Sequence, residues 1–241
     1  MNYTMIKRFY ILLLAIVASV GMSWATTTDL ASITSDYTAQ DGEILTGTLG
    51  VNVKISIAPG ATVTLNGVDI NSSGTWTGGD YAGITCPGNA TIILADGTVN
   101  RIKGFLNGNS AIHIKPNYTL TIEGDGTLYA STQGGAAAIG CGYSDSGGSR
   151  NGGNIVINGG TIYANGGSLA AGIGGGGRAT IGNITINGGI IYAVGGGTGA
   201  GIGGGQSKSN SWKSICGNIT ISSNVKYLKA TKGSGAAHSI G

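Results

Sequence analysis

Residues 154–164 read NIVINGGTIYA, and residues 183–193 read NITINGGIIYA. In both segments apolar and polar residues alternate before an Asn-Gly-Gly corner, and an apolar pair follows it. Alternation with a period of two is typical of a strand that turns one face to a core. Asn-Gly-Gly accepts positive φ at low cost. Each segment therefore predicts two short strands joined by a tight corner.

The same unit recurs along the chain. The first inward residues of the main strands are expected to be Val63, Ile92, Leu120, Ile155, Ile184 and Ile219. A shorter strand upstream of each is marked by Ile55, Ile84, Ile112, Ile139, Ile173 and Ile202, with Ile240 opening a further unit. A third strand follows each corner, with inward residues Val99, Leu128, Ile162 and Ile191.

A repeat of about 30 residues with three short strands and no helical periodicity indicates a solenoid. We expect an all-β fold, a single-stranded parallel β-helix of about six to seven coils. It should be right-handed, because parallel crossovers almost always are. The composition agrees, since 48 of 241 residues are Gly, which suits the corners, and only 3 are Pro, which excludes collagen.

The chain divides into three expected regions. Residues 1–25 resemble a signal peptide, with Lys7 and Arg8 before an apolar run at residues 11–20 and small residues at Ser23 and Ala25. That run is shorter than the roughly 20 residues that span a bilayer, so we expect export to the cell surface or medium and no stable membrane insertion.

Residues 26–50 are expected to form a lead-in or cap, and residues 51–241 the β-helix. We expect this helix to end in mid-coil, just after Ile240. An unpaired coil edge is a template for another strand, so we expect end-to-end self-association.

Acidic residues are confined to the first part of the chain, because none of the 10 Asp and Glu follows Asp145. Asp96 and Asp125 occupy Gly corners, where Asp suits the turn, and His113 and His238 are isolated. The residues therefore predict no catalytic or metal site; the alternative is an enzyme, a polysaccharide lyase or glycoside hydrolase. The later basic residues are too sparse to predict a nucleic acid partner.

Two groups of residues are candidates for binding. If Leu128, Ile162 and Ile191 face inward, then Tyr129, Tyr163 and Tyr192 face solvent on three successive coils, with Asn100 before them and Lys229 after. Sugars stack on aromatic rings, and phenols can bond their hydroxyls. The alternative is that these tyrosines only pack on one another across the strands.

The second group lies in long loops that leave one corner of the last three complete coils. Repeat proteins often place insertions on their binding face. These loops carry Tyr143, Arg150, Arg178, Lys208, Trp212 and Lys213.

Two further columns are interpreted as structural. Asn154, Asn183 and Asn218 precede the main strands of successive coils, where stacked Asn side chains can bond one another. Cys86 and Cys141 hold equivalent inward positions two coils apart, about 9.6 Å, which is too far for a disulfide. With Cys216 at another corner, all three thiols are expected to be unpaired.

The order of the motifs LNGVDI, IILADGTVN, LTIEGDGTLYA and INGGTIYA over residues 51–230 resembles a family of secreted right-handed β-helix proteins described as carbohydrate-binding. Its members are similar to polygalacturonate- and cellulose-binding modules built on a pectate-lyase-like helix. The resemblance implies binding of a polysaccharide, anionic ones included, without catalysis. It also implies calcium held by acidic residues before the main strands, but here those places are Asn154, Asn183 and Asn218. The residues themselves predict no cofactor. A structural or adhesive surface protein that presents its loops to a protein partner is the alternative.

Overall fold

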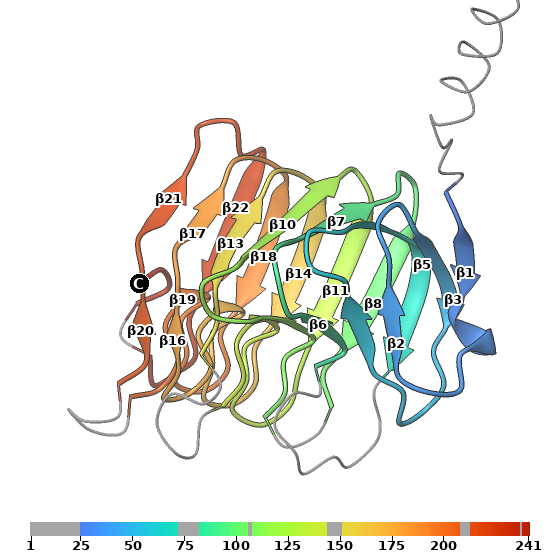
Figure 1. The fold of residues 1–241 in the computed structure, drawn as a ribbon. Helices are drawn as coiled ribbons and strands as arrows, with labels where there is room; N and C mark the ends of the chain where they lie inside the picture. The colour runs from blue at the N-terminus through green and yellow to red at the C-terminus, as the bar shows by residue number, and fades with distance from the viewer. Residues whose placement is uncertain (1–24, 72–81, 106–107, 144–150, 208–212, 237) are drawn as a thin grey trace, which may run out of the picture.

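The computed structural model describes residues 25–71, 82–105, 108–143, 151–207, 213–236 and 238–241. Over these residues the chain winds as a parallel β-helix, which confirms the predicted fold class (Figure 1). A 13-stranded sheet and a 7-stranded sheet run along it. The expected signal peptide, apart from Ala25, falls outside the described residues.

The 7-stranded sheet contains the six predicted short strands, and β2 from the expected lead-in is its seventh. In order they are β2 (Tyr37–Ala39), β4 (Ile55–Ile57), β6 (Ile84–Cys86), β9 (Ile112–Ile114), β12 (Ile139–Gly140), β15 (Ile173–Gly174) and β19 (Ile202–Gly203). The predicted isoleucine column pairs without a shift from Ile55 to Ile202, and Ile202 bridges to Ile240. The column is therefore confirmed along its whole length.

The 13-stranded sheet has two limbs that meet at β5 (Thr62–Asn71). The main limb contains β7 (Ala90–Leu94), β10 (Thr119–Gly124), β13 (Asn154–Ile157), β17 (Ile184–Ile186) and β21 (Ile219–Ile221). The other, here called the tyrosine limb, contains β8 (Val99–Lys103), β11 (Thr127–Ser131), β14 (Thr161–Asn165), β18 (Ile190–Val194) and β22 (Tyr227–Thr231). Gly67, with φ +75°, lies between the half of β5 that pairs with β7 and the half that pairs with β8.

Parallel pairing begins within the expected lead-in. β1 (Thr27–Asp29) pairs with β3 (Ile44–Thr48), and β3 pairs with β5. A one-turn 3₁₀ helix, η1 (Leu30–Ser32), follows β1. Glu43 ties this end together by accepting hydrogen bonds from Thr28 Oγ1, Tyr37 Oη and the Gln40 amide. The solenoid thus starts before residue 51.

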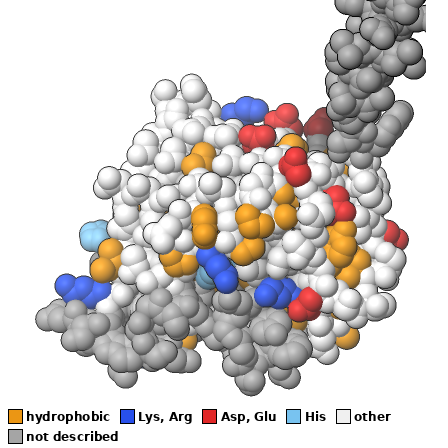
Figure 2. Space-filling model, in the orientation of Figure 1, with side chains coloured by type: hydrophobic (Ala, Val, Ile, Leu, Met, Phe, Trp, Pro, Cys, Tyr) orange, Lys and Arg blue, Asp and Glu red, His pale blue; other side chains and the backbone are white. Residues whose placement is uncertain are grey.

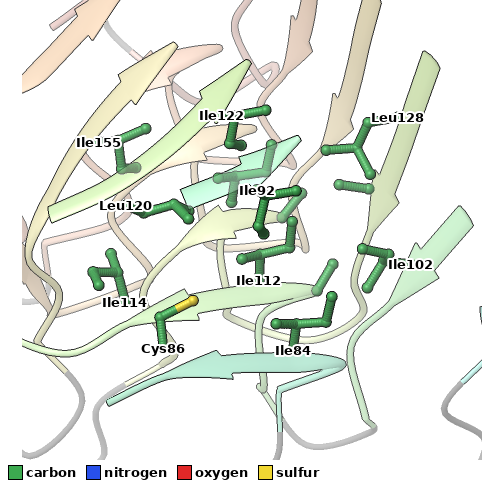
Figure 3. Packing of buried hydrophobic residues seen from close by; sticks show 14 of the residues in the cluster. Ile84, Cys86, Ile92, Ile102, Ile112, Ile114, Leu120, Ile122, Leu128 and Ile155 are labelled. Atoms are coloured by element: carbon green, nitrogen blue, oxygen red, sulfur yellow. The ribbon is translucent and has the colours of Figure 1, made fainter. Parts of the chain in front are cut away.

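The core is a stack of aliphatic columns inside the coils (Figure 3). Leu128, Ile162 and Ile191 are fully buried, as predicted. Cys86 belongs to the same core on the side of the 7-stranded sheet, where it pairs in register with Ile114. All three cysteines are free thiols, as predicted, and burial raises the pKa of Cys86 and of Cys141 to about 12.

Two predicted registers are wrong. Ile92 pairs with Ile122, and Leu120 pairs with Ala90, so the main-strand column shifts by two residues at this coil. On β8 the inward residue is Asn100, which is fully buried and pairs with Leu128, whereas Val99 is 39% exposed. Asn100 therefore does not precede the tyrosines in their outward column.

The bend in β5 explains the buried asparagine. The amides of Gly67 and Val68 lie between the two paired halves of that strand, and Asn100 Oδ1 accepts hydrogen bonds from both, at 2.9 and 3.1 Å. Asn100 Nδ2 donates to Thr98 Oγ1 and to the carbonyl of Thr127. A buried amide side chain is tolerated because its groups are bonded, and a valine could not supply that acceptor.

The asparagine column before the main strands is structural, but it bonds differently from the expectation. Asn154 Oδ1 accepts from the backbone amide of Asn183 at 2.8 Å, and Asn183 Oδ1 accepts from that of Asn218 at 2.9 Å. Each side chain therefore holds the backbone of the next coil. Bonding between side chains occurs at the following corner, where Asn187 Nδ2 donates to Asn158 Oδ1 at 3.0 Å.

Candidate functional site

The outward side of the tyrosine limb, here called the tyrosine face, carries three columns of side chains. The central column, read along the axis from β5, is Asp69, Arg101, Tyr129, Tyr163, Tyr192 and Lys229. One flanking column is Val99, Thr127, Thr161, Ile190 and Tyr227, and the other is Asn71, Lys103, Ser131, Asn165, Val194 and Thr231. The three tyrosines and Lys229 lie in one column as predicted, and Arg101 holds the place expected for Asn100.

The tyrosines of this column stack on one another. Ring centroids are 4.6 Å apart for Tyr129 and Tyr163 and 4.8 Å apart for Tyr163 and Tyr192, with 5° between the planes in both pairs. These separations match the spacing of neighbouring strands. Tyr227 continues the stack beside Tyr192 at 5.2 Å, tilted by 39°. At the other end, the guanidinium of Arg101 lies 5.4 Å from the centroid of Tyr129.

Stacking decides which part of each ring a ligand can reach. Because neighbouring rings cover the faces of Tyr163, its accessible part is the edge that bears the hydroxyl. Desolvation raises the pKa of Tyr163, and the charges of Tyr129 and Tyr192 raise it further. The phenol therefore stays protonated at neutral pH and can both donate and accept a hydrogen bond.

A groove of about 250 Å³ lies at the Arg101 end of the tyrosine face. Its floor includes Ile70 and Ile102, whose side chains are buried in the core. Its walls come from the central column and one flanking column: Asp69, Arg101 and Tyr129 on one side, and Asn71, Lys103 and Ser131 on the other. The groove thus runs between two side-chain columns and combines two cations with one carboxylate.

The loop residues form a smaller cluster at a different corner, after the short strands. The guanidinium of Arg178 lies 5.0 Å from the ring centroid of Tyr143, so the structure brings these two predicted residues together. Arg178 has φ +61°, and its amide donates to the carbonyl of Gln206 at 2.8 Å. Lys213 is exposed in the loop of the next coil. Arg150, Lys208 and Trp212 lie outside the described residues.

Acidic side chains are seen toward the end where the chain begins, and none is visible at the opposite end (Figure 2). In the described part of the chain, no group of three or more His, Cys, Asp or Glu side chains is placed to hold a metal ion. Where the resemblance would put calcium ligands, Asn154 and Asn183 accept backbone hydrogen bonds. Among the described residues, no helix is both long enough and apolar enough to span a membrane.

Sequence reasoning missed Arg101 because it placed β8 one residue out of register. It also missed a groove at the Asn-Gly-Gly corners, because that groove depends on small differences in corner length between neighbouring coils. Comparison of the chain with protein-family models, with curated proteins and with solved structures gives no match.

Proposed function

We propose that this protein is a secreted, non-catalytic β-helix that binds polysaccharide on its tyrosine face. The observation that carries the proposal is the stack of Tyr129, Tyr163 and Tyr192, which repeats one ring edge and one hydroxyl on three successive coils. A linear polysaccharide also repeats its hydroxyls and apolar C–H groups along one axis. A sheet of parallel strands holds such a row rigidly, so little ordering is needed on binding.

The glycan is proposed to lie parallel to the solenoid axis, with successive sugars against successive coils. Phenol hydroxyls bond sugar hydroxyls, and ring edges contact the apolar parts of the sugar. The groove at one end adds Arg101 and Lys103, which suit a carboxylate or another electron-rich group. The same face therefore admits an anionic polysaccharide as well as a neutral one.

Isothermal titration of the purified protein with a panel of plant and host polysaccharides tests the proposal. At least one should bind, and the Tyr129→Ala, Tyr163→Ala, Tyr192→Ala triple variant should lose that binding while its circular dichroism stays native. No heat with any polysaccharide at millimolar sugar would contradict the proposal. Release of reducing or unsaturated ends during the same incubations would contradict the absence of catalysis.

A further inference from the structure

A second groove, here called the corner groove, has a volume of about 260 Å³ and lies where the main limb turns into the tyrosine limb. It exists because two neighbouring corners are short. The corner from Ile157 to Thr161 and the corner from Ile186 to Ile190 are each one residue shorter than that from Ile122 to Thr127. They are two residues shorter than the corner from Ile221 to Tyr227. The longer corners on either side therefore stand out as walls.

Glycine backbone forms the floor of the corner groove. A Cβ at Gly159 would lie 2.6 Å from the carbonyl oxygen of Gly124, and one at Gly188 would lie 2.5 Å from that of Asn158. Among the residues that the structure describes, the amides of Gly159 and Gly188 have no acceptor. These distances explain why glycine is required at both positions, since each corner lies against the preceding coil. Because the two glycines line the groove and carry no side chain, a ligand in it meets the main chain there, at the half-buried Gly159 more than at the buried Gly188.

The side chains around this floor are polar. Asp125 stands on one wall, and Asn224 and Lys226 stand on the other. Between them, the bond from Asn187 to Asn158 leaves the Asn158 amino group as a donor and the Asn187 oxygen as an acceptor. The opposite charges of Asp125 and Lys226 balance, so the corner groove offers many hydrogen bonds without favouring an ion of either sign. That combination suits a neutral polyhydroxylated group.

The corner groove adjoins the tyrosine face directly. Thr161 and Ile190 line it, and they lie two residues before Tyr163 and Tyr192 on the same strands, on the same outward side. Two residues of a strand span about 6–7 Å, roughly the width of one sugar ring. A single ligand can thus contact both places.

We propose that the corner groove binds a neutral sugar branching from a polysaccharide whose backbone lies on the tyrosine face. The inference rests on the proposed function and adds a substrate class to it: branched rather than unbranched polysaccharide. The backbone supplies contacts with the stacked rings, while the branch is recognised by Asp125, the paired asparagines and the glycine amides.

Titrations with two matched pairs of oligosaccharides test this inference. In each pair the backbone is shared: mannohexaose against a galactosyl-substituted manno-oligosaccharide, and cellohexaose against a xyloglucan oligosaccharide. The branched member of at least one pair should bind about tenfold more tightly, as one or two further hydrogen bonds would give. Equal affinity within both pairs would overturn the inference.

Two variants assign any preference to the corner groove. Asn187→Leu fills it from an exposed position and should lower the affinity for the branched oligosaccharide to that of the unbranched one, leaving the latter unchanged. Asn218→Leu makes the same change at an exposed position of another corner. It should leave the affinities for the branched and the unbranched oligosaccharide unchanged. An equal effect of Asn187→Leu on both oligosaccharides would contradict a branch-specific role.

A separate measurement distinguishes failure of this inference from failure of the proposed function. Methyl galactoside and methyl xyloside are titrated while the amide resonances of Gly159 and Gly188 are followed by NMR. At least one glycoside should shift these two amide resonances in the wild type, and neither glycoside should shift them in the Asn187→Leu variant. Shifts without any polysaccharide binding on the tyrosine face would refute the proposed function alone. Polysaccharide binding without shifts or branch preference would refute the corner groove alone.

Discussion

Tyr129 and Tyr163, which lie on successive coils, stack with their ring centroids 4.6 Å apart and their planes within 5° of parallel. Tyr192 repeats this arrangement on the next coil. The spacing follows from strand pairing, because Tyr129 pairs with Tyr163 and Tyr163 with Tyr192 in an unshifted parallel register. The backbone thus sets the separation of the phenol hydroxyls before any ligand arrives.

Ionisation of Tyr163 should report on this stack. Its pKa is raised above the ordinary value of about 10 by desolvation and then by the charges of Tyr129 and Tyr192. The Tyr129→Phe, Tyr192→Phe double variant removes those charges, so the pKa of Tyr163 should fall while desolvation keeps it above the ordinary value. An NMR titration of labelled tyrosine measures this, and an unchanged midpoint would contradict the electrostatic contact.

The same shift predicts how Tyr163 affects stability at alkaline pH. Because its pKa is higher in the folded protein, the unfolded chain loses this proton first as the pH rises. The contribution of Tyr163 should therefore be fully present below about pH 10 and decrease as the pH passes through the folded pKa. Urea unfolding gives the free energy of unfolding of wild type and Tyr163→Phe between pH 8 and pH 11. The stability of the wild type relative to the variant should fall over this range, and a rise would contradict the prediction.

Asn100→Ala should strongly destabilise the fold. The substitution leaves the amides of Gly67 and Val68 buried without their acceptor, and the loss should be about 2–4 kcal/mol. Asn165→Ala, at an exposed position of β14, is the control and should change stability by less than about 0.5 kcal/mol. Urea unfolding, monitored by circular dichroism, compares the two variants. Similar midpoints would show that Asn100 does not support the bend.

Gly174→Ala should be more damaging than most glycine substitutions. Gly174 has φ +133°, and a Cβ there would collide with the carbonyl oxygen of Gly203 on the next coil. Gly97 has φ +68° with open space around it, so Gly97→Ala should cost only about 1–2 kcal/mol of backbone strain. The loss of stability caused by Gly174→Ala should be clearly larger than this, or the variant should fail to fold. Thermal unfolding of the two variants measures both losses of stability. Equal losses would contradict the close contact between coils.

The three thiols should differ in reactivity. Burial raises the pKa of Cys86 and Cys141 to about 12 and that of the half-buried Cys216 to about 11. Since the thiolate is the reactive form, iodoacetamide at pH 8 should leave Cys86 and Cys141 unmodified in the native protein and label Cys216 slowly. All three should react in urea. Rapid native labelling of Cys86, read by mass spectrometry, would contradict the packing of the core.

The sequence was sufficient to predict the coils because each inward position repeats. The isoleucines from Ile55 to Ile202 recur once per coil, and all of them fill one column. The pattern could not place Ile92, since a shift of two residues keeps every side chain on the same face. Only the pairing of Ile92 with Ile122 resolves that ambiguity.

The errors at the site have equally specific causes. Val99 looked inward because it is apolar, yet Asn100 takes the core position since the bend at Gly67 requires a buried acceptor. Because the predicted register of β8 was wrong by one residue, Arg101 was not assigned to the central column. The contact between Tyr143 and Arg178 joins loops of different coils and has no periodic signal. The tyrosine column was predictable because its residues follow the repeat.

The most direct test of polysaccharide binding on the tyrosine face compares two tyrosine variants. Tyr163→Ala removes the middle ring of the stack, whereas Tyr118→Ala removes a 40% exposed tyrosine from the turn between β9 and β10. On a polysaccharide that binds the wild type, titration should show a several-fold loss of affinity for Tyr163→Ala, equivalent to about 1 kcal/mol, and none for Tyr118→Ala. Equal affinities of all three proteins, with native circular dichroism, would contradict the account.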